Sequence, residues 1–251
     1  MMDELTFIQI ALVVMLALIS LMVILTVGLK VLRFLRAAWF RRHFRRIEPA
    51  LENFMLTGDE QPELLALRPW KRDLFLSRLI VERMVYLKGA GREFLMRLAD
   101  ELGLVDRYLK ALDSRRRWRR ARSAENLGYF GGARSVRSLG MLLTDEDETI
   151  RAVAARALAR IGNDEAVRLL ASTLDTPSEL TRLRVAENLE RVGKPAVGHL
   201  IASLSDVTSF GTKNLHGPIM AARVLGHLRA AEARDVLRRA AKEGKEIDLR
   251  A

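Results

Sequence analysis

Few side chains in this 251-residue sequence have the types and spacing that chemistry requires. Four acidic residues stand in a row at 145–148, and neighbouring carboxylates of this kind can hold a cation. The row also precedes a predicted helix, where the macrodipole favours acidic residues, and that explains it without any ion. The histidines show no metal-ligand spacing and no surrounding cluster of Glu; they are His43, His199, His216 and His227. We therefore predict no metal site.

Motifs for phosphate binding and for nucleophilic catalysis do not occur. The sequence has no Walker loop, no Gly-x-Gly-x-x-Gly and no Gly-x-Ser-x-Gly elbow. The Gly-Ala-Gly segment at 89–91 is typical of a turn between helices rather than of a phosphate cradle. We therefore expect no catalytic residue, no cofactor and no enzyme activity.

Basic residues gather in two short blocks that together exceed the net charge of +11, because residues 30–46 carry +7 and residues 105–122 carry +6. The second block surrounds a single Trp, and three interpretations stay open for it. It is a solvated helix face, a contact for lipid headgroups or an acidic partner, or a nucleic-acid site, for which one Trp is weak evidence. Our candidate partner-binding residues come from this block and from a predicted loop at 205–218. They are Arg115, Arg116, Arg117, Trp118, Arg119, Arg120, Phe210, Lys213 and His216.

The first block follows a long apolar stretch. Residues 5–29 carry no charge, and 20 of these 25 positions are Leu, Ile, Val, Phe, Met or Ala. As a helix the stretch is about 37 Å long, enough to cross a bilayer core of about 30 Å. A cleaved signal peptide would have a basic start and a shorter apolar part, whereas Asp3 and Glu4 precede this stretch. We predict a single transmembrane helix at 5–29.

The basic residues after this stretch predict its orientation. Seven Lys or Arg and no acid lie between positions 30 and 46, which places this side in the cytoplasm and residues 1–4 outside. Each such side chain gains about 1 kcal/mol beside anionic lipid, and an aromatic ring suits the interface. The predicted membrane-surface residues are Lys30, Arg33, Arg36, Trp39, Arg41, Arg42, Arg45 and Arg46.

Between the membrane and the second basic block we predict two further regions. Residues 30–62 form a basic juxtamembrane helix, interrupted or restarted at Pro49, and a linker from 57 to 62. Residues 63–114 form a leading region that caps the following fold, with helices near 69–88, 92–102 and 104–112.

An internal repeat dominates the remainder, residues 115–251. The pattern Ala-x-x-Leu-x-x-apolar occurs four times at spacings of 31, 31 and 36 residues, starting at Ala124, Ala155, Ala186 and Ala222. Its three marked positions lie on one helical face, where small Ala allows close packing and Leu fills the layer. Gly follows the first three copies, and we expect it to end each helix in the left-handed conformation.

A second helix follows each copy. An aliphatic residue stands fifteen positions after each marker Ala: Leu139, Leu170, Ile201 and Leu237. The second helices are predicted near 133–144, 164–174, 195–204 and 232–243. Stacked pairs of such helices bury a continuous core. Five extra residues enlarge the loop at 205–218, as a tolerated insertion or a binding loop.

An Arg recurs four residues before the first three marker Ala, at Arg120, Arg151 and Arg182, and Pro218 takes its place in the fourth copy. Pairing with nearby acids that ties one repeat to the next is one interpretation, and ligand binding is the other.

The best copy, residues 147–167, contains Asp-x-x-Ile-Arg, then Ala-Ala-x-Ala-Leu-x-x-Ile-Gly, then Ala-Val. Residues 115–243 thereby resemble HEAT repeats of the short bacterial type, which are also found in the phycobilisome-lyase-like HEAT family. The predicted fold is all-α: a single transmembrane helix followed by a cytoplasmic α-solenoid of HEAT-like helix pairs.

The predicted anchor and the extended surface of a solenoid indicate a scaffold or adaptor in a bacterial inner (cytoplasmic) membrane, and the resemblance suggests the class of its partner. Its expected partners are a protein, itself in the membrane, such as an envelope glycosyltransferase or polysaccharide-synthase complex, and anionic lipid at the juxtamembrane segment. A bilin-lyase-like enzyme and a nucleic-acid binder similar to HEAT-like DNA glycosylases are the alternatives. The anchor, the basic leader and the lack of a convergent polar site disfavour the lyase, and the lack of an assignable catalytic carboxylate disfavours the glycosylase-like binder.

Overall fold

The computed structural model describes residues 4–57, 76–210 and 216–243, and these ranges contain helices and turns but no strand. The protein is therefore all-α, as predicted. It divides into two compact units, Met1–Leu67 and Arg68–Ala251.

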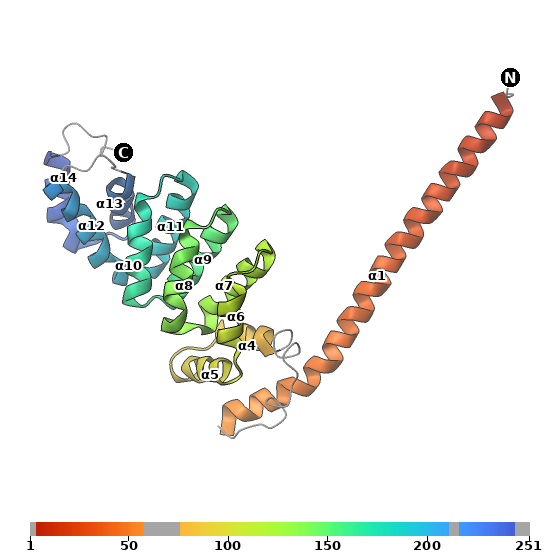
Figure 1. Ribbon diagram of the computed structural model, residues 1–251, viewed down its shortest axis with the longest axis horizontal. Helices are drawn as coiled ribbons and strands as arrows, with labels where there is room; N and C mark the ends of the chain where they lie inside the picture. The colour runs from red at the N-terminus through yellow and green to blue at the C-terminus, as the bar shows by residue number, and fades with distance from the viewer. Residues whose placement is uncertain (1–3, 58–75, 211–215, 244–251) are drawn as a thin grey trace. The chain divides into compact units, whose positions relative to one another are not determined.

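The first unit contains one long helix, α1, from Glu4 to Thr57. Its 54 residues correspond to about 80 Å of helix. Pro49 lies inside α1, so the expected interruption there is wrong. Proline costs a helix one backbone hydrogen bond and kinks it without always ending it, and Figure 1 shows α1 bending toward its C-terminal end. The predicted linker beyond Thr57 lies outside the described residues.

Within α1, the segment Leu12–Trp39 is long and apolar enough to cross a membrane, and none of it is buried in the structure. Its large apolar side chains stand open, with Met22 71% and Ile24 68% exposed. Water-soluble proteins rarely expose so much contiguous apolar surface. This segment extends past the end of the stretch at 5–29 and takes in Lys30, Arg33 and Arg36.

The described part of the second unit begins with three short helices, α4 (Ser77–Met84), α5 (Ala90–Glu101) and α6 (Leu104–Ala111). Their apolar faces are buried, and all three pack against α7. They correspond to the three predicted leading helices, although the predicted start of the first, at 69, lies outside the described residues.

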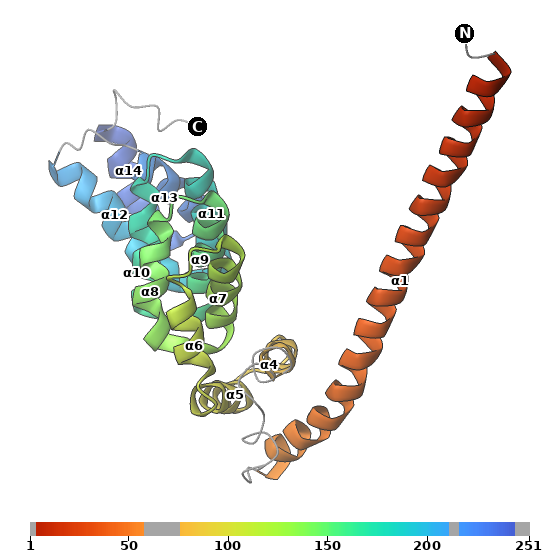
Figure 2. The same cartoon turned by 45° about the vertical axis from the view of Figure 1, so that its right-hand side comes forward.

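Four helix pairs follow. The first helices are α7 (Arg117–Phe130), α9 (Glu148–Ile161), α11 (Glu179–Val192) and α13 (His216–His227). The second helices are α8 (Val136–Met141), α10 (Asp164–Ser172), α12 (Val197–Phe210) and α14 (Arg234–Glu243). Each first helix packs on the next first helix and each second helix on the next second helix, which gives the two layers seen in Figures 1 and 2. This is the predicted solenoid.

The repeated Leu forms the centre of the core. The four copies, Leu127, Leu158, Leu189 and Leu225, are at most 1% exposed. The marker Ala is buried in the first three copies, whereas in the fourth the preceding Ala221 is buried and Ala222 is half-buried.

The third pair differs from the predicted register by one residue. Ile201 is half-buried, and Leu200 and Leu204 occupy the core instead. The buried Ala166, in the first turn of α10, and the equivalent buried Ala196, directly before α12, are 30 rather than 31 positions apart. The inter-helix turn is thus one residue shorter, which moves every core position of α12 by one.

Helix α12 also continues through Phe210 rather than ending near 204. The predicted loop at 205–218 is therefore helical over its first six residues. No Gly or Pro occurs from Ser205 to Phe210, so nothing in the local sequence ends the helix before Gly211.

The residues that follow the four first helices adopt different backbone conformations. Gly162 adopts the left-handed conformation with φ 63° and ψ 14°, and Gly193 has φ 75° with an extended ψ of −133°. Gly131 has φ −75°, so the expectation of a left-handed residue there is wrong; the next residue, Gly132, has φ 53°. In the fourth copy Arg229 adopts φ 51°.

Candidate functional site

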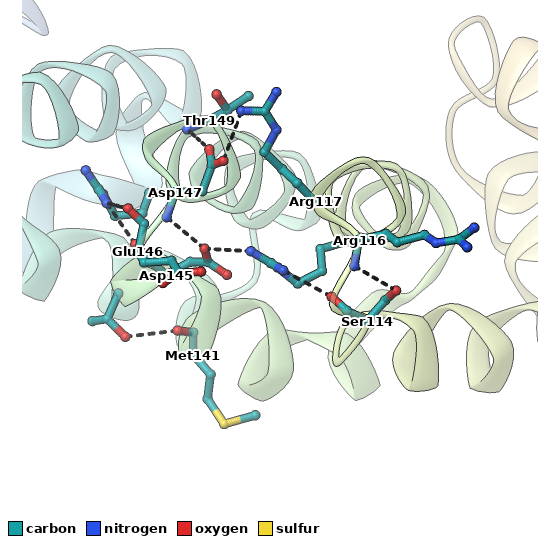
Figure 3. A network of polar contacts seen from close by, with 11 residues as sticks. Ser114, Arg116, Arg117, Met141, Asp145, Glu146, Asp147 and Thr149 are labelled. Carbon is teal, nitrogen blue, oxygen red and sulfur yellow. Dashed lines mark hydrogen bonds and ion pairs between the residues drawn. The ribbon is translucent and has the colours of Figure 1, made fainter.

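Arg120 lies in a nearly buried ion pair rather than on an open surface. Its Nη2 is 3.2 Å from Oδ1 of Asp145, and the two side chains are only 14% and 10% exposed. Its Nη1 donates to the carbonyl oxygen of Ser114 at 3.0 Å. Arg120 therefore ties the first helix pair to the second, in the network that Figure 3 shows around Asp145.

The other recurring arginines make the matching contact with the carbonyl six residues earlier. Arg151 Nη1 donates to the carbonyl of Asp145, and Arg182 Nη1 to that of Thr176, both at 2.8 Å. Arg151 also reaches the next pair, where its Nε donates to Oγ1 of Thr181 at 2.8 Å. The structure supports the interpretation in which these arginines join neighbouring repeats, and not the one in which they bind a ligand. Some of the contacts are made to backbone carbonyl oxygens rather than to acidic side chains.

Three of the four consecutive acids have side-chain partners: Asp145 pairs with Arg120, Asp147 with Arg117, and Glu148 lies 3.8 Å from Arg151. Asp147 caps α9, because its carboxylate accepts the Thr149 N–H at 2.8 Å, and Arg117 lies 3.3 Å from it. Desolvation raises the pKa of Asp147, but the hydrogen bonds from Thr149 and Arg117 outweigh it and hold the pKa below its ordinary value. Asp145 accepts the Asp147 N–H at 2.9 Å. Among the described residues, no group of three or more His, Cys, Asp or Glu is placed to hold a metal ion.

The other predicted residues of the basic block are exposed at the start of α7. Trp118 is 59% exposed. Arg117 keeps 70% of its side chain exposed despite its contact with Asp147. The remaining exposed members are Arg115, Arg116 and Arg119.

Helical register extends this surface along the solenoid. Trp118, Thr149 and Leu180 are 31 residues apart and stand in the first turns of α7, α9 and α11, which pack side by side. Leu180 is 47% exposed, and Leu183, one turn later, is 40% exposed. We call these four residues the first-turn row. Sequence reasoning missed Leu180 and Leu183 because it followed the 31-residue period only through core positions.

The predicted loop residues are only partly described. Phe210 ends α12, but its side chain lies outside the described part of the structure, as does all of Lys213. His216 begins α13 and is exposed. A binding role for this loop stays a prediction.

Two of the remaining histidines join neighbouring repeats at the surface. Nε2 of His199 is 2.8 Å from Oδ1 of Asp164, and Nδ1 of His227 is 2.6 Å from Oε1 of Glu190. Each contact joins one repeat to the previous one.

All eight predicted membrane-surface residues fall in α1. The described side chains among them are exposed: Lys30, Arg33, Trp39, Arg42 and Arg45. The side chains of Arg36, Arg41 and Arg46 lie outside the described part of the structure.

Stacked helix pairs of this kind define the class of α-solenoids. The family model described as HEAT repeats matches residues 105–208, from α6 into α12, so this part of the chain is similar to HEAT repeats. No curated protein sequence matches the chain. Among solved structures, the chain is similar to a crystal structure of an engineered protein, a target of the Northeast Structural Genomics Consortium. The two are 20% identical with a TM-score of 0.37, over 74% of this chain and 93% of that one.

Proposed function

We propose that this protein is a membrane-anchored scaffold whose HEAT-repeat solenoid binds a protein partner through the start of α7 and the first-turn row. The exposure of Trp118, Leu180 and Leu183 beside exposed arginines carries the proposal. Protein interfaces are enriched in Trp and Arg, and exposed apolar side chains rimmed by charge are typical of docking surfaces.

The chemistry of the surface defines its partner. Four exposed arginines, Arg115, Arg116, Arg117 and Arg119, flank Trp118 in the sequence. Such a surface complements a protein face that combines carboxylates with a small apolar patch, since opposite potentials steer association and buried aromatic anchors supply affinity. Arg120 is not part of it, because its guanidinium already pairs with Asp145.

Segment Leu12–Trp39 supports the anchoring part of the proposal. In this proposal the apolar part of α1 crosses the inner membrane of a bacterium with the N-terminus outside. The exposed side chains of Lys30, Arg33, Arg42 and Arg45 then contact anionic lipid headgroups on the cytoplasmic side. A partner in the same membrane fits this arrangement, and the resemblance suggests an envelope glycosyltransferase or polysaccharide-synthase complex.

Crosslinking in native membranes followed by purification of the tagged full-length chain tests the scaffold. The test variant reverses three exposed charges at the start of α7: Arg115→Glu, Arg116→Glu and Arg119→Glu. The control variant reverses three exposed charges on α14: Arg234→Glu, Arg238→Glu and Arg239→Glu.

We expect one membrane protein to crosslink to the wild type and to the α14 variant, and to be lost from the α7 variant. Equal recovery with both variants contradicts the proposed surface. Recovery of nucleic acid or of a tetrapyrrole in place of a protein contradicts the scaffold and supports one of the alternatives.

A further inference from the structure

A pocket of about 360 Å³ lies at the C-terminal ends of α7 and α9, where α5 packs against α7. Arg92 and Met96 of α5 line it together with Tyr129 of α7 and Arg160 and Ile161 of α9. Its volume is in the range of small-molecule sites, about 300–1,000 Å³. It is separate from the first-turn row, which is at the opposite ends of the same helices.

Arg160 is the unusual residue of this pocket. Its Cζ lies 3.7 Å from the centroid of the Tyr129 ring, so the guanidinium stacks on the aromatic face. Its Nη1 is buried and has no hydrogen-bond partner among the described residues. A buried donor without an acceptor is costly, and a bound oxyanion would supply the acceptor.

The next repeat shows what Arg160 lacks. Arg191 stands 31 residues later, at the equivalent position of α11, and its Nη2 is 2.7 Å from Oε1 of Glu187. The residue four positions before Arg160 is Arg156, which itself pairs with Glu125 at 3.3 Å. Arg160 therefore has no acid in the place that satisfies Arg191.

Positive charge is concentrated around this guanidinium. Burial lowers the pKa of Arg160, and the charges of Arg156 and Arg92 lower it further, against the opposing influence of Tyr129 and Glu125. Both Arg92 and Arg160 line the pocket. An anion bound between them would relieve their mutual repulsion.

We propose that this pocket binds the phosphate or carboxylate group of a small organic anion, with Arg92 and Arg160 as its ligands. The planar guanidinium matches the geometry of an oxyanion and forms charge-assisted, two-point hydrogen bonds to it. Met96, Ile161 and the Tyr129 ring give the pocket an apolar side, so the ligand carries a small apolar or aromatic body.

The test uses the full-length protein in a neutral detergent, with the methionine methyl groups labelled for NMR. Met96 lines the pocket, and the Met96→Leu variant assigns its signal among the nine methionines. Phenyl phosphate is the probe, and phenol is the neutral counterpart with the same ring. We expect phenyl phosphate to shift the Met96 signal saturably and phenol to leave it unchanged.

Matched arginine variants locate the site. Arg92→Gln and Arg160→Gln should each weaken phenyl phosphate binding at least about tenfold, the loss of one charge-assisted contact. Arg191→Gln removes the equivalent arginine of the next repeat, outside the pocket, and should bind like the wild type. Circular dichroism of each variant checks that the helices are intact.

Three results would overturn the proposal. The first is the absence of a saturable Met96 shift in the wild type. The second is equal binding of phenol and phenyl phosphate, which would define an apolar pocket without anion recognition. The third is undiminished binding by folded Arg92→Gln and Arg160→Gln. None of these results bears on the scaffold proposal, which rests on a different surface.

Discussion

Arg229 shows at the residue scale how one copy of the repeat departs from the others. It follows α13 at the place where Gly ends the first three copies, and it has φ 51°. Its N–H donates to the Gly226 carbonyl at 3.0 Å, and the Ala230 N–H donates to the Leu225 carbonyl at 3.2 Å. This pair of bonds is a Schellman motif, whose positive-φ position Gly occupies at least cost.

We predict that Arg229→Gly stabilises the protein by about 1 kcal/mol, since a left-handed conformation costs other residues about 1–2 kcal/mol. Thermal unfolding followed by circular dichroism measures the change. Arg229→Ala is the control, because it removes the charge and keeps the Cβ. If Arg229→Ala stabilises the protein equally, lost charge repulsion and not backbone strain is the cause.

Gly128 sets the distance between α7 and α9. A Cβ at this position would lie 2.7 Å from the Cα of Ala157 and 2.8 Å from its Cβ. Gly128→Ala should therefore destabilise the solenoid, by about 1–3 kcal/mol for an overpacked core site. Gly226→Ala in α13 is the control, because its Cβ meets nothing within 4 Å and the change should be neutral or stabilising. Equal unfolding midpoints for both variants would contradict this prediction, because they would show that α7 and α9 can move apart without loss of stability.

Arg120 acts at the scale of the element, because its partners lie before α7 and before α9. We predict that Arg120→Ala destabilises the protein by about 3 kcal/mol, since it leaves the nearly buried carboxylate of Asp145 without its cation. Exposed Arg119 is the matched control, and Arg119→Ala should change stability by less than about 0.5 kcal/mol. Chemical denaturation of both variants measures the difference, and a small effect of Arg120→Ala would contradict the fastening role.

The helices of the solenoid follow closely from the sequence, because one pattern repeats at a fixed period. Ala-x-x-Leu-x-x-apolar located α7, α9, α11 and α13, and the aliphatic residue fifteen positions later located the second helices. The pattern contains no information on turn length, so it missed the one-residue shift that buries Leu200 in place of Ile201. Pro49 was a misleading signal, because a long helix absorbs a single proline as a bend.

The candidate sites were harder to predict because they depend on which side chains are already paired. Composition identifies the arginines at 115–120 but cannot separate Arg120, which is paired, from its exposed neighbours. The pocket at Tyr129 and Arg160 brings α5, α7 and α9 together, and a period read along the chain does not show such a junction. Comparing equivalent positions would have given one signal, since Arg191 has an acid four residues earlier and Arg160 does not.

At the scale of the whole molecule, the chain separates two kinds of surface. Unit Met1–Leu67 presents apolar side chains that are exposed along α1. Unit Arg68–Ala251 buries most of its described apolar residues between helices and exposes arginines, with Trp118, Leu180 and Leu183 among its exposed apolar side chains. In the proposed function, the first unit provides a membrane anchor and the second a water-exposed scaffold. This division predicts that the full-length chain stays with membranes after alkaline extraction and is released only by detergent.

The most direct test of the account is the labelling of single cysteines in spheroplasts with a membrane-impermeant maleimide. The chain contains no cysteine, so each introduced thiol reports alone. Met2→Cys lies before the apolar stretch, and Ser172→Cys lies at an exposed position of the solenoid. We predict that Met2→Cys is labelled in intact spheroplasts and that Ser172→Cys is labelled only after lysis. Labelling of Ser172→Cys in intact spheroplasts, or recovery of the full-length chain in the soluble fraction, would contradict a scaffold anchored on the cytoplasmic side.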